Sequence, residues 1–138
     1  MSKIIGSNLP NMPWEDQPKS LVGPVWRYSK NPIIERNPKP GIARIFNSAV
    51  IAYGDAYIGV FRAETTATLP HLRLGHSKNG IDWDIEDEPI QFVDEKRQPC
   101  QPYYAYDPRL IDVEGMYYIV WCTDFHGPTI GLAETKDF

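Results

Sequence analysis

The sequence repeats itself at an interval of sixty residues, and this repeat constrains the fold more than any other feature of the chain. Residues 46–62 align without a gap on residues 106–122, so that aromatic, apolar and turn positions coincide. Residues 72–80 align on residues 130–138 at an offset of 58, because the second connecting loop is two residues shorter. A gapless match of this length indicates two copies of one structural unit, as in propellers and solenoids.

Each copy of the unit has the pattern of short antiparallel strands. In the first copy the candidate strands are rich in β-branched and aromatic residues and cover residues 46–52, 56–62, 72–77 and 82–85. Asn79-Gly80 predicts a tight hairpin turn before the last of them. Four strands within about 40 residues match one propeller blade, so the predicted fold class is all-β, a β-propeller. The second copy stops at Phe138, before its fourth strand, which leaves about two blades.

The first 45 residues differ from the repeats in composition. They contain seven of the thirteen prolines, and proline disfavours both helices and central strands. We therefore expect an extended arm over residues 1–45, with Trp14 and Trp26 as anchors and a short strand over Val25–Tyr28, followed by blades over residues 46–138. The charged stretch between the two copies, residues 86–103, predicts a solvated loop.

The composition argues against several kinds of partner. Fourteen basic and eighteen acidic residues give a net charge of −4 without a basic stripe, so no nucleic acid is expected. No apolar run reaches membrane-spanning length and the N-terminus lacks a signal-peptide pattern, which predicts a soluble, cytoplasmic protein without a membrane partner. Cys100, Cys122 and the three histidines show no metal-ligand spacing, so we expect no metal and a buried thiol at Cys122.

Asp107 is the candidate catalytic residue. It lies where a strand is expected to leave a loop, and a carboxyl held there by a rigid element can transfer a proton to a bound ligand. An Asp before proline also commonly begins a turn, which is the alternative interpretation. The repeat favours the catalytic interpretation, because Asn47 falls on Asp107 and equivalent ends of neighbouring blades converge on the central channel of a propeller.

Polar side chains near these positions suit a sugar. Asn47 and Ser48 offer hydrogen-bond donors and acceptors, and Arg62 offers a cationic fork, while aromatic residues form flat walls for sugar rings. Alternating positions of a strand share one side, so Arg109 is expected beside Asp107, where its charge would stabilise the carboxylate and lower the pKa of Asp107, the wrong direction for a general acid. Whether Arg109 turns away from Asp107 stays open at this point.

Several short segments of the chain are specific when they occur together and in order. They include Ile45-Phe46-Asn47-Ser48, Gly59-Val60-Phe61-Arg62, Ser77-Lys78-Asn79-Gly80, Tyr106-Asp107-Pro108-Arg109 and His126-Gly127-Pro128-Thr129. With these segments the chain resembles glycoside hydrolase family 130, the inverting mannoside phosphorylases with a five-bladed β-propeller, and within it most of all the β-1,4-mannooligosaccharide phosphorylases. The resemblance covers nearly the whole chain.

The resemblance implies roles for these residues. Asp107 matches the family's single catalytic acid, and the residues that match those holding the terminal mannosyl unit are Asn47, Ser48, Arg62 and Tyr106. Inorganic phosphate, with no organic cofactor, would attack the anomeric carbon of a β-mannoside with inversion and release α-mannose 1-phosphate. Because phosphate is already an anionic nucleophile, one carboxyl suffices where an inverting hydrolase needs two. The resemblance also implies that the proton passes from the acid through the mannosyl 3-hydroxyl.

Several alternatives stay open. The acceptor sugar could be a mannooligosaccharide, glucose or N-acetylglucosamine, the same scaffold also carries β-mannoside hydrolases, and a propeller can bind sugar without turnover. The family's phosphate-binding residues lie in later blades, so the resemblance implies that these residues are the N-terminal part of a larger domain and are inactive alone. The arm could pack on its own propeller or reach a neighbour in a homo-oligomer.

We expect residues 1–138 alone to aggregate, because two blades leave open sheet edges and apolar faces exposed. Size-exclusion chromatography combined with thermal unfolding of the isolated segment measures this. A monomer that melts cooperatively would contradict the expectation.

Overall fold

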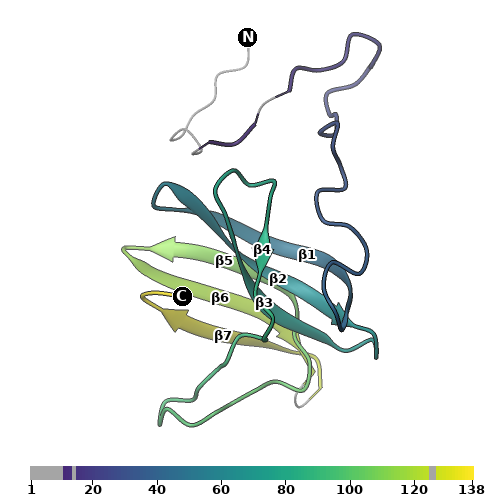
Figure 1. Ribbon diagram of the computed structural model, residues 1–138. Coiled ribbons are helices and arrows are strands. Elements are labelled where there is room, and N and C mark those ends of the chain that lie inside the picture. Colours follow the sequence, from purple (N-terminus) through teal and green to yellow (C-terminus); the bar gives the residue numbers. More distant parts are fainter. Residues whose placement is uncertain (1–10, 14, 125–126) are drawn as a thin grey trace.

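The computed structural model describes residues 11–13, 15–124 and 127–138, which form an extended arm followed by two antiparallel sheets (Figure 1). The first sheet consists of β1 (Ile42–Tyr53), β2 (Ala56–Thr65), β3 (Pro70–Ser77) and β4 (Asp84–Ile85). The second sheet consists of β5 (Tyr106–Val113), β6 (Met116–Thr123) and β7 (Thr129–Thr135). In both sheets the spatial order of the strands follows the chain, as in a propeller blade. The described part of the chain has no helix long and apolar enough to cross a membrane.

The repeat of the sequence is present in the hydrogen-bond register. Ala49 of β1 pairs with Val60 of β2, and their equivalents sixty residues later, Arg109 and Val120, pair in the second sheet. The third strands keep the shorter offset of 58, since Tyr57 pairs with Ser77 and its equivalent Tyr117 pairs with Thr135. The strand pairing therefore confirms the all-β prediction and both offsets of the sequence repeat.

The arm and the first strand differ from expectation. β1 begins at Ile42, inside the segment assigned to the arm, because Ile42 pairs with Thr65 at the far end of β2 and extends the ladder. The strand expected over Val25–Tyr28 was wrong, since these residues belong to no strand. Trp26 instead donates its indole N–H to the carbonyl of Glu15 at 3.2 Å. Trp14 and residues 1–10 lie outside the described residues.

A turn built by side chains shortens the fourth strand. The hydroxyl oxygen of Ser77 accepts hydrogen bonds from the backbone N–H of Asn79 at 3.2 Å and of Gly80 at 2.9 Å. Gly80 has a φ of 71°, which glycine adopts without steric cost. Trp83 then packs on Phe61 with ring centroids 4.8 Å apart, and only Asp84–Ile85 pair with β3. The turn is therefore wider than the tight hairpin that the Asn-Gly pair predicted.

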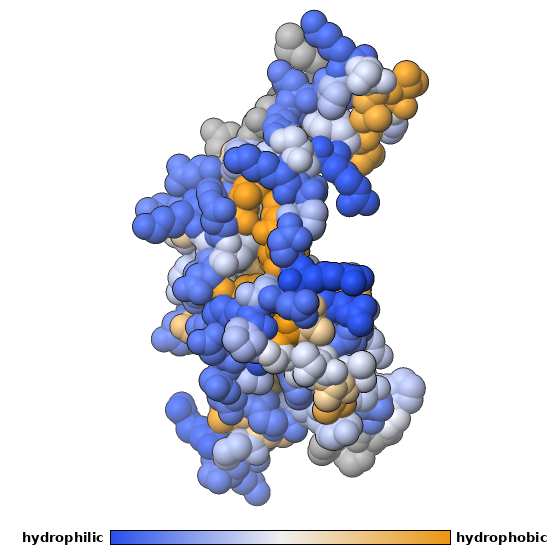
Figure 2. Space-filling view, turned by 45° about the vertical axis from the view of Figure 1, so that its right-hand side comes forward, coloured by the Kyte–Doolittle hydropathy of each residue, from blue (hydrophilic) through white to orange (hydrophobic). Residues whose placement is uncertain are grey.

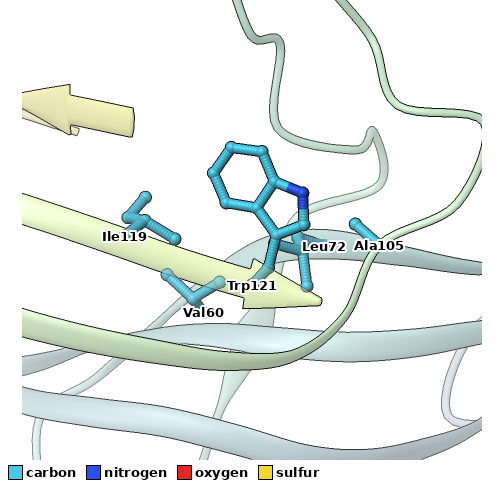
Figure 3. Packing of buried hydrophobic residues seen from close by; sticks show 5 residues of the cluster. All are labelled: Val60, Leu72, Ala105, Ile119 and Trp121. Carbon is cyan, nitrogen blue, oxygen red and sulfur yellow. The ribbon is translucent and has the colours of Figure 1, made fainter. Parts of the chain in front are cut away.

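The hydrophobic core lies between the two sheets (Figure 3). Its buried members come from both sheets and from the end of their connection, and they are Val60, Leu72, Ala105, Ile119 and Trp121. The connection is not merely solvated, because Ile90 and Phe92 pack against this cluster and Phe92 stacks on Trp121 with ring centroids 4.4 Å apart. Packing across the two sheets therefore fixes one blade against the other.

Apolar side chains also reach the surface. Figure 2 shows them gathered in patches on an otherwise largely polar face of the molecule. On β7, Ile130 and Leu132 are 73% and 66% exposed, whereas Leu72, the equivalent of Ile130 in the first sheet, is only 2% exposed. The difference arises because the second sheet covers this face of the first sheet, which agrees with the expected apolar blade faces.

Gly131→Ala should destabilise the complete protein by about 1–3 kcal/mol, because overpacking a filled site costs this much. A Cβ atom at Gly131 would overlap the indole ring of Trp121, which is 7% exposed and stacked on Phe92, so the ring or the strand would have to shift. The free energy of unfolding in urea measures the loss. In a Trp121→Leu background the same substitution should cost much less, and an equal cost in both backgrounds would exclude the clash as its cause.

Candidate functional site

Two β-bulges at the matching point of the repeat shape the candidate site. The strand register shifts by one residue between Ile45 and Ser48 of β1, and again between Tyr106 and Arg109 of β5. A bulge leaves an extra residue outside the ladder and redirects its side chain. Asn47 lies within the first bulge and Asp107 within the second, so the same irregularity directs both side chains.

The backbone at Asp107 explains why a short polar residue occupies this bulge. Its φ is 51°, in the left-handed region that Asp and Asn adopt more readily than other non-glycine residues. Bulky or β-branched side chains would be strained there. Asp107 is thus a bulge residue at the start of β5 rather than the first residue of a turn.

Two donors from the first sheet hold the Asp107 carboxyl. Nδ2 of Asn47 and Nη1 of Arg62 each donate a hydrogen bond to Oδ1 of Asp107 at 2.9 Å. The side chains of Arg62 and Asp107 are 23% and 33% exposed, so solvent reaches this ion pair only in part. Within residues 11–13, 15–124 and 127–138, Oδ2 of Asp107 has no hydrogen-bond partner. This second oxygen is therefore available to accept a further hydrogen bond.

Aromatic rings surround the Arg62 guanidinium. Its Cζ atom lies 4.9 Å from the ring centroid of Phe46 and 5.4 Å from that of Tyr106, within the range of cation–π attraction. Phe46 and Tyr106 are equivalent positions of the repeat, in β1 and β5. The two blades therefore supply one ring each to a cation that belongs to the first.

A cleft of about 340 Å³ opens beside Arg62 and is lined by Arg62, Glu64, Thr68, Leu69, Pro70, Tyr103, Tyr104 and Tyr106. The rings of Tyr104 and Tyr106 lie 5.6 Å apart. A hydrogen bond with Asp124, together with partial burial, raises the pKa of Tyr104 to about 12. Its hydroxyl therefore remains protonated at neutral pH. Flat rings beside a few polar groups are a chemistry suited to a carbohydrate.

Two residues expected near Asp107 lie elsewhere. Ser48 donates its hydroxyl to the carbonyl of Phe46 at 2.9 Å and lines a separate hollow between the arm and the first sheet. Arg109 is exposed and donates from Nη1 to the carbonyl of Pro108 at 2.8 Å. The bulge breaks the alternation that would have placed Arg109 beside Asp107, and the cation that pairs with Asp107 is Arg62.

Sequence reasoning missed two features of the site. It treated Phe46 only as a position of the repeat, although the aromatic pair at positions 46 and 106 was a usable signal. It also missed the pairing of Tyr104 with Asp124, which no local pattern indicates.

Other candidate ligands are not gathered into a site. Among the described residues, no group of His, Cys, Asp and Glu could hold a metal ion. Cys100 and Cys122 are free thiols, and Cys122 is only partly buried. His126 lies outside the described residues.

Comparisons with known proteins identify the family of the chain. The family described as β-1,4-mannooligosaccharide phosphorylase matches residues 7–138. The β-1,4-mannooligosaccharide phosphorylase of Ruminococcus albus is 40% identical over 142 residues, which cover 98% of this chain and 42% of that protein. The chain therefore spans less than half the length of this curated relative.

Solved structures share the fold at lower sequence identity. One, described with the GH130 family of mannoside phosphorylases that contains hydrolases of β-1,2 mannosidic linkages in Candida mannan, has a TM-score of 0.65 at 19% identity, covering 88% of this chain and 40% of that one. A glycosyl hydrolase of Bacteroides ovatus has a TM-score of 0.64 at 19% identity, covering 94% and 42%. Because the family match spans residues 7–138 and the two sheets are blades of its propeller fold, this chain belongs to glycoside hydrolase family 130, the β-1,4-mannooligosaccharide phosphorylase family.

Proposed function

We propose that this chain supplies the proton donor and part of the sugar site of an enzyme that cleaves β-1,4-linked mannosides with inorganic phosphate and releases α-mannose 1-phosphate. The observation that carries the proposal is the single carboxyl of Asp107, which is fixed through Oδ1 and open at Oδ2. The family and the 40% identical mannooligosaccharide phosphorylase support the choice of reaction and substrate.

The hydrogen bonds around Asp107 support one position for the proton. Oδ1 already accepts two hydrogen bonds, from Asn47 and Arg62, so a proton on the carboxyl resides on Oδ2. From Oδ2 it can pass to an oxygen of the bound mannoside within hydrogen-bond reach, either directly or through the 3-hydroxyl. The bond between the anomeric carbon and the leaving oxygen breaks as that oxygen gains the proton. Phosphate forms the new bond from the opposite face, which inverts the configuration.

The carboxyl that lines the cleft, that of Glu64, is already engaged. Glu64 forms an ion pair with Arg44, with Oε2 and Nε 3.3 Å apart, and its side chain is 15% exposed. An inverting hydrolase needs a free carboxylate to activate water. The engagement of Glu64 therefore favours phosphate over water as the nucleophile, and hydrolysis of β-mannosides is the second candidate function.

Asp107→Asn in the complete protein should lower the rate of phosphorolysis by roughly 10²–10⁴-fold, the usual contribution of a positioned acid. Asn can still accept the two hydrogen bonds through its amide oxygen and suits the left-handed backbone, so sugar binding should change little. Release of mannose 1-phosphate from β-1,4-mannobiose and calorimetric binding of mannobiose measure the two effects. Asp112→Asn, on the same strand, is the matched control, and retained turnover in Asp107→Asn would refute the role.

Turnover of mannobiose by the complete protein should require phosphate and yield the α anomer of mannose 1-phosphate, because inversion at a β-linkage gives an α product. Phosphorus NMR and mannose assays, with and without phosphate, separate the two reactions. Release of free mannose at an equal rate without phosphate would instead establish the hydrolase, and Glu64→Gln should then abolish the activity.

A further inference from the structure

We propose that Phe46 is a positioning residue that, together with Tyr106, holds the Arg62 guanidinium against Oδ1 of Asp107. This inference deepens the proposed function and depends on it only for its catalytic consequence. The substrate-holding roles implied by the resemblance include Arg62 and Tyr106 but not Phe46. The contacts of Arg62 are the reason to add it.

Hydrogen bonds alone do not fix the Arg62 side chain. In the described part of the chain its Nη1 donates to Asp107, while Nε is buried without a hydrogen-bond partner. A single hydrogen bond leaves a planar guanidinium free to rotate about that bond. A buried N–H group without a hydrogen-bond partner also raises the free energy of this position of the Arg62 side chain. Other contacts must therefore keep the guanidinium beside the carboxyl.

The aromatic rings supply these contacts. Cζ of Arg62 lies closer to the Phe46 ring centroid, at 4.9 Å, than to that of Tyr106, at 5.4 Å. A ring face attracts a guanidinium within about 6 Å through its quadrupole and favours stacked geometry. The Arg62 guanidinium therefore contacts one ring from each blade, because Phe46 belongs to β1 and Tyr106 belongs to β5.

Burial in the core does not account for the place of Phe46. Its ring is 40% exposed, in contrast to Phe61 of the same sheet, which is 3% exposed. The ring instead faces cations, since Cζ of Arg44 lies 5.5 Å from its centroid in addition to that of Arg62. Phe46 lies within the bulge between Ile45 and Ser48 and lines the hollow between the arm and the first sheet, while its ring contacts Arg62. Its contacts are therefore those of a residue that orders charged groups rather than one that fills a core.

NMR of the complete protein labelled with ¹⁵N-arginine tests the contact without requiring activity. The Arg62 Nε–H signal, assigned by its loss in Arg62→Gln, should be displaced by the ring currents of Phe46 and Tyr106. Phe46→Leu should move this signal toward that of exposed arginines, and Phe46→Tyr should leave it in place. An unchanged Arg62 signal in Phe46→Leu would overturn the inference.

Kinetics test the consequence for Asp107. Phe46→Leu should lower kcat for mannobiose phosphorolysis about five- to tenfold, with a smaller change in KM, because Arg62 would no longer be held on Oδ1 and the Asp107 carboxyl would lose its fixed orientation. Phe46→Tyr should restore kcat, since Tyr occupies the equivalent position 106. In an Arg62→Gln background Phe46→Leu should have no further effect, because Phe46 acts through Arg62.

Phe92→Leu is the matched control for lost stability. It removes an aromatic ring from the core beside Trp121, away from Arg62, and should lower the melting temperature without changing kcat. Equal kcat values for Phe46→Leu and the unmodified active enzyme would overturn the catalytic consequence. If the unmodified protein shows no phosphorolysis, the proposed function fails, and the Arg62 NMR signal still decides whether Phe46 holds the guanidinium.

Discussion

The hydrogen bonds that Asn47 and Arg62 donate to Oδ1 of Asp107 join the two sheets at the candidate site. The donors belong to the first blade and the acceptor to the second, so neither blade alone forms the arrangement. Each bond is 2.9 Å long and therefore tolerates only a small displacement of one sheet against the other. The chemistry of Asp107 thus depends on how firmly the two blades are packed.

The inter-sheet core provides that packing. Val60 and Arg62 lie two positions apart on β2, so they project from the same side of the strand. Val60 contacts the core that also contains Ile119 and Trp121, and Arg62 reaches the carboxyl of Asp107. One strand, β2, therefore contributes both to the inter-sheet core and to the candidate site.

The two copies of the repeat both have a bulge at the candidate site but carry different side chains there. The same bulge presents the amide of Asn47 in one blade and the carboxyl of Asp107 in the next. At the facing position of the second strand, Arg62 in the first blade corresponds to Cys122 in the second. One cation, one amide and one acid therefore meet at the junction, whereas identical residues at positions 47 and 107 would have placed two amides or two carboxyls together. Opposite charges at this point attract instead of repelling.

The amino-acid sequence by itself determined the repeat, the all-β class and the candidate acid Asp107, because the spacing of a repeat and the type of each residue can be read directly from the chain. It also indicated that Asn47 and Asp107 meet, since a repeat maps equivalent positions onto one channel. Only the tertiary structure decided that β1 begins at Ile42, that Arg62 rather than Arg109 pairs with Asp107, and that Ser48 faces another hollow. These outcomes depend on a one-residue bulge and on contacts between distant strands, and neither leaves a periodic signal in the chain.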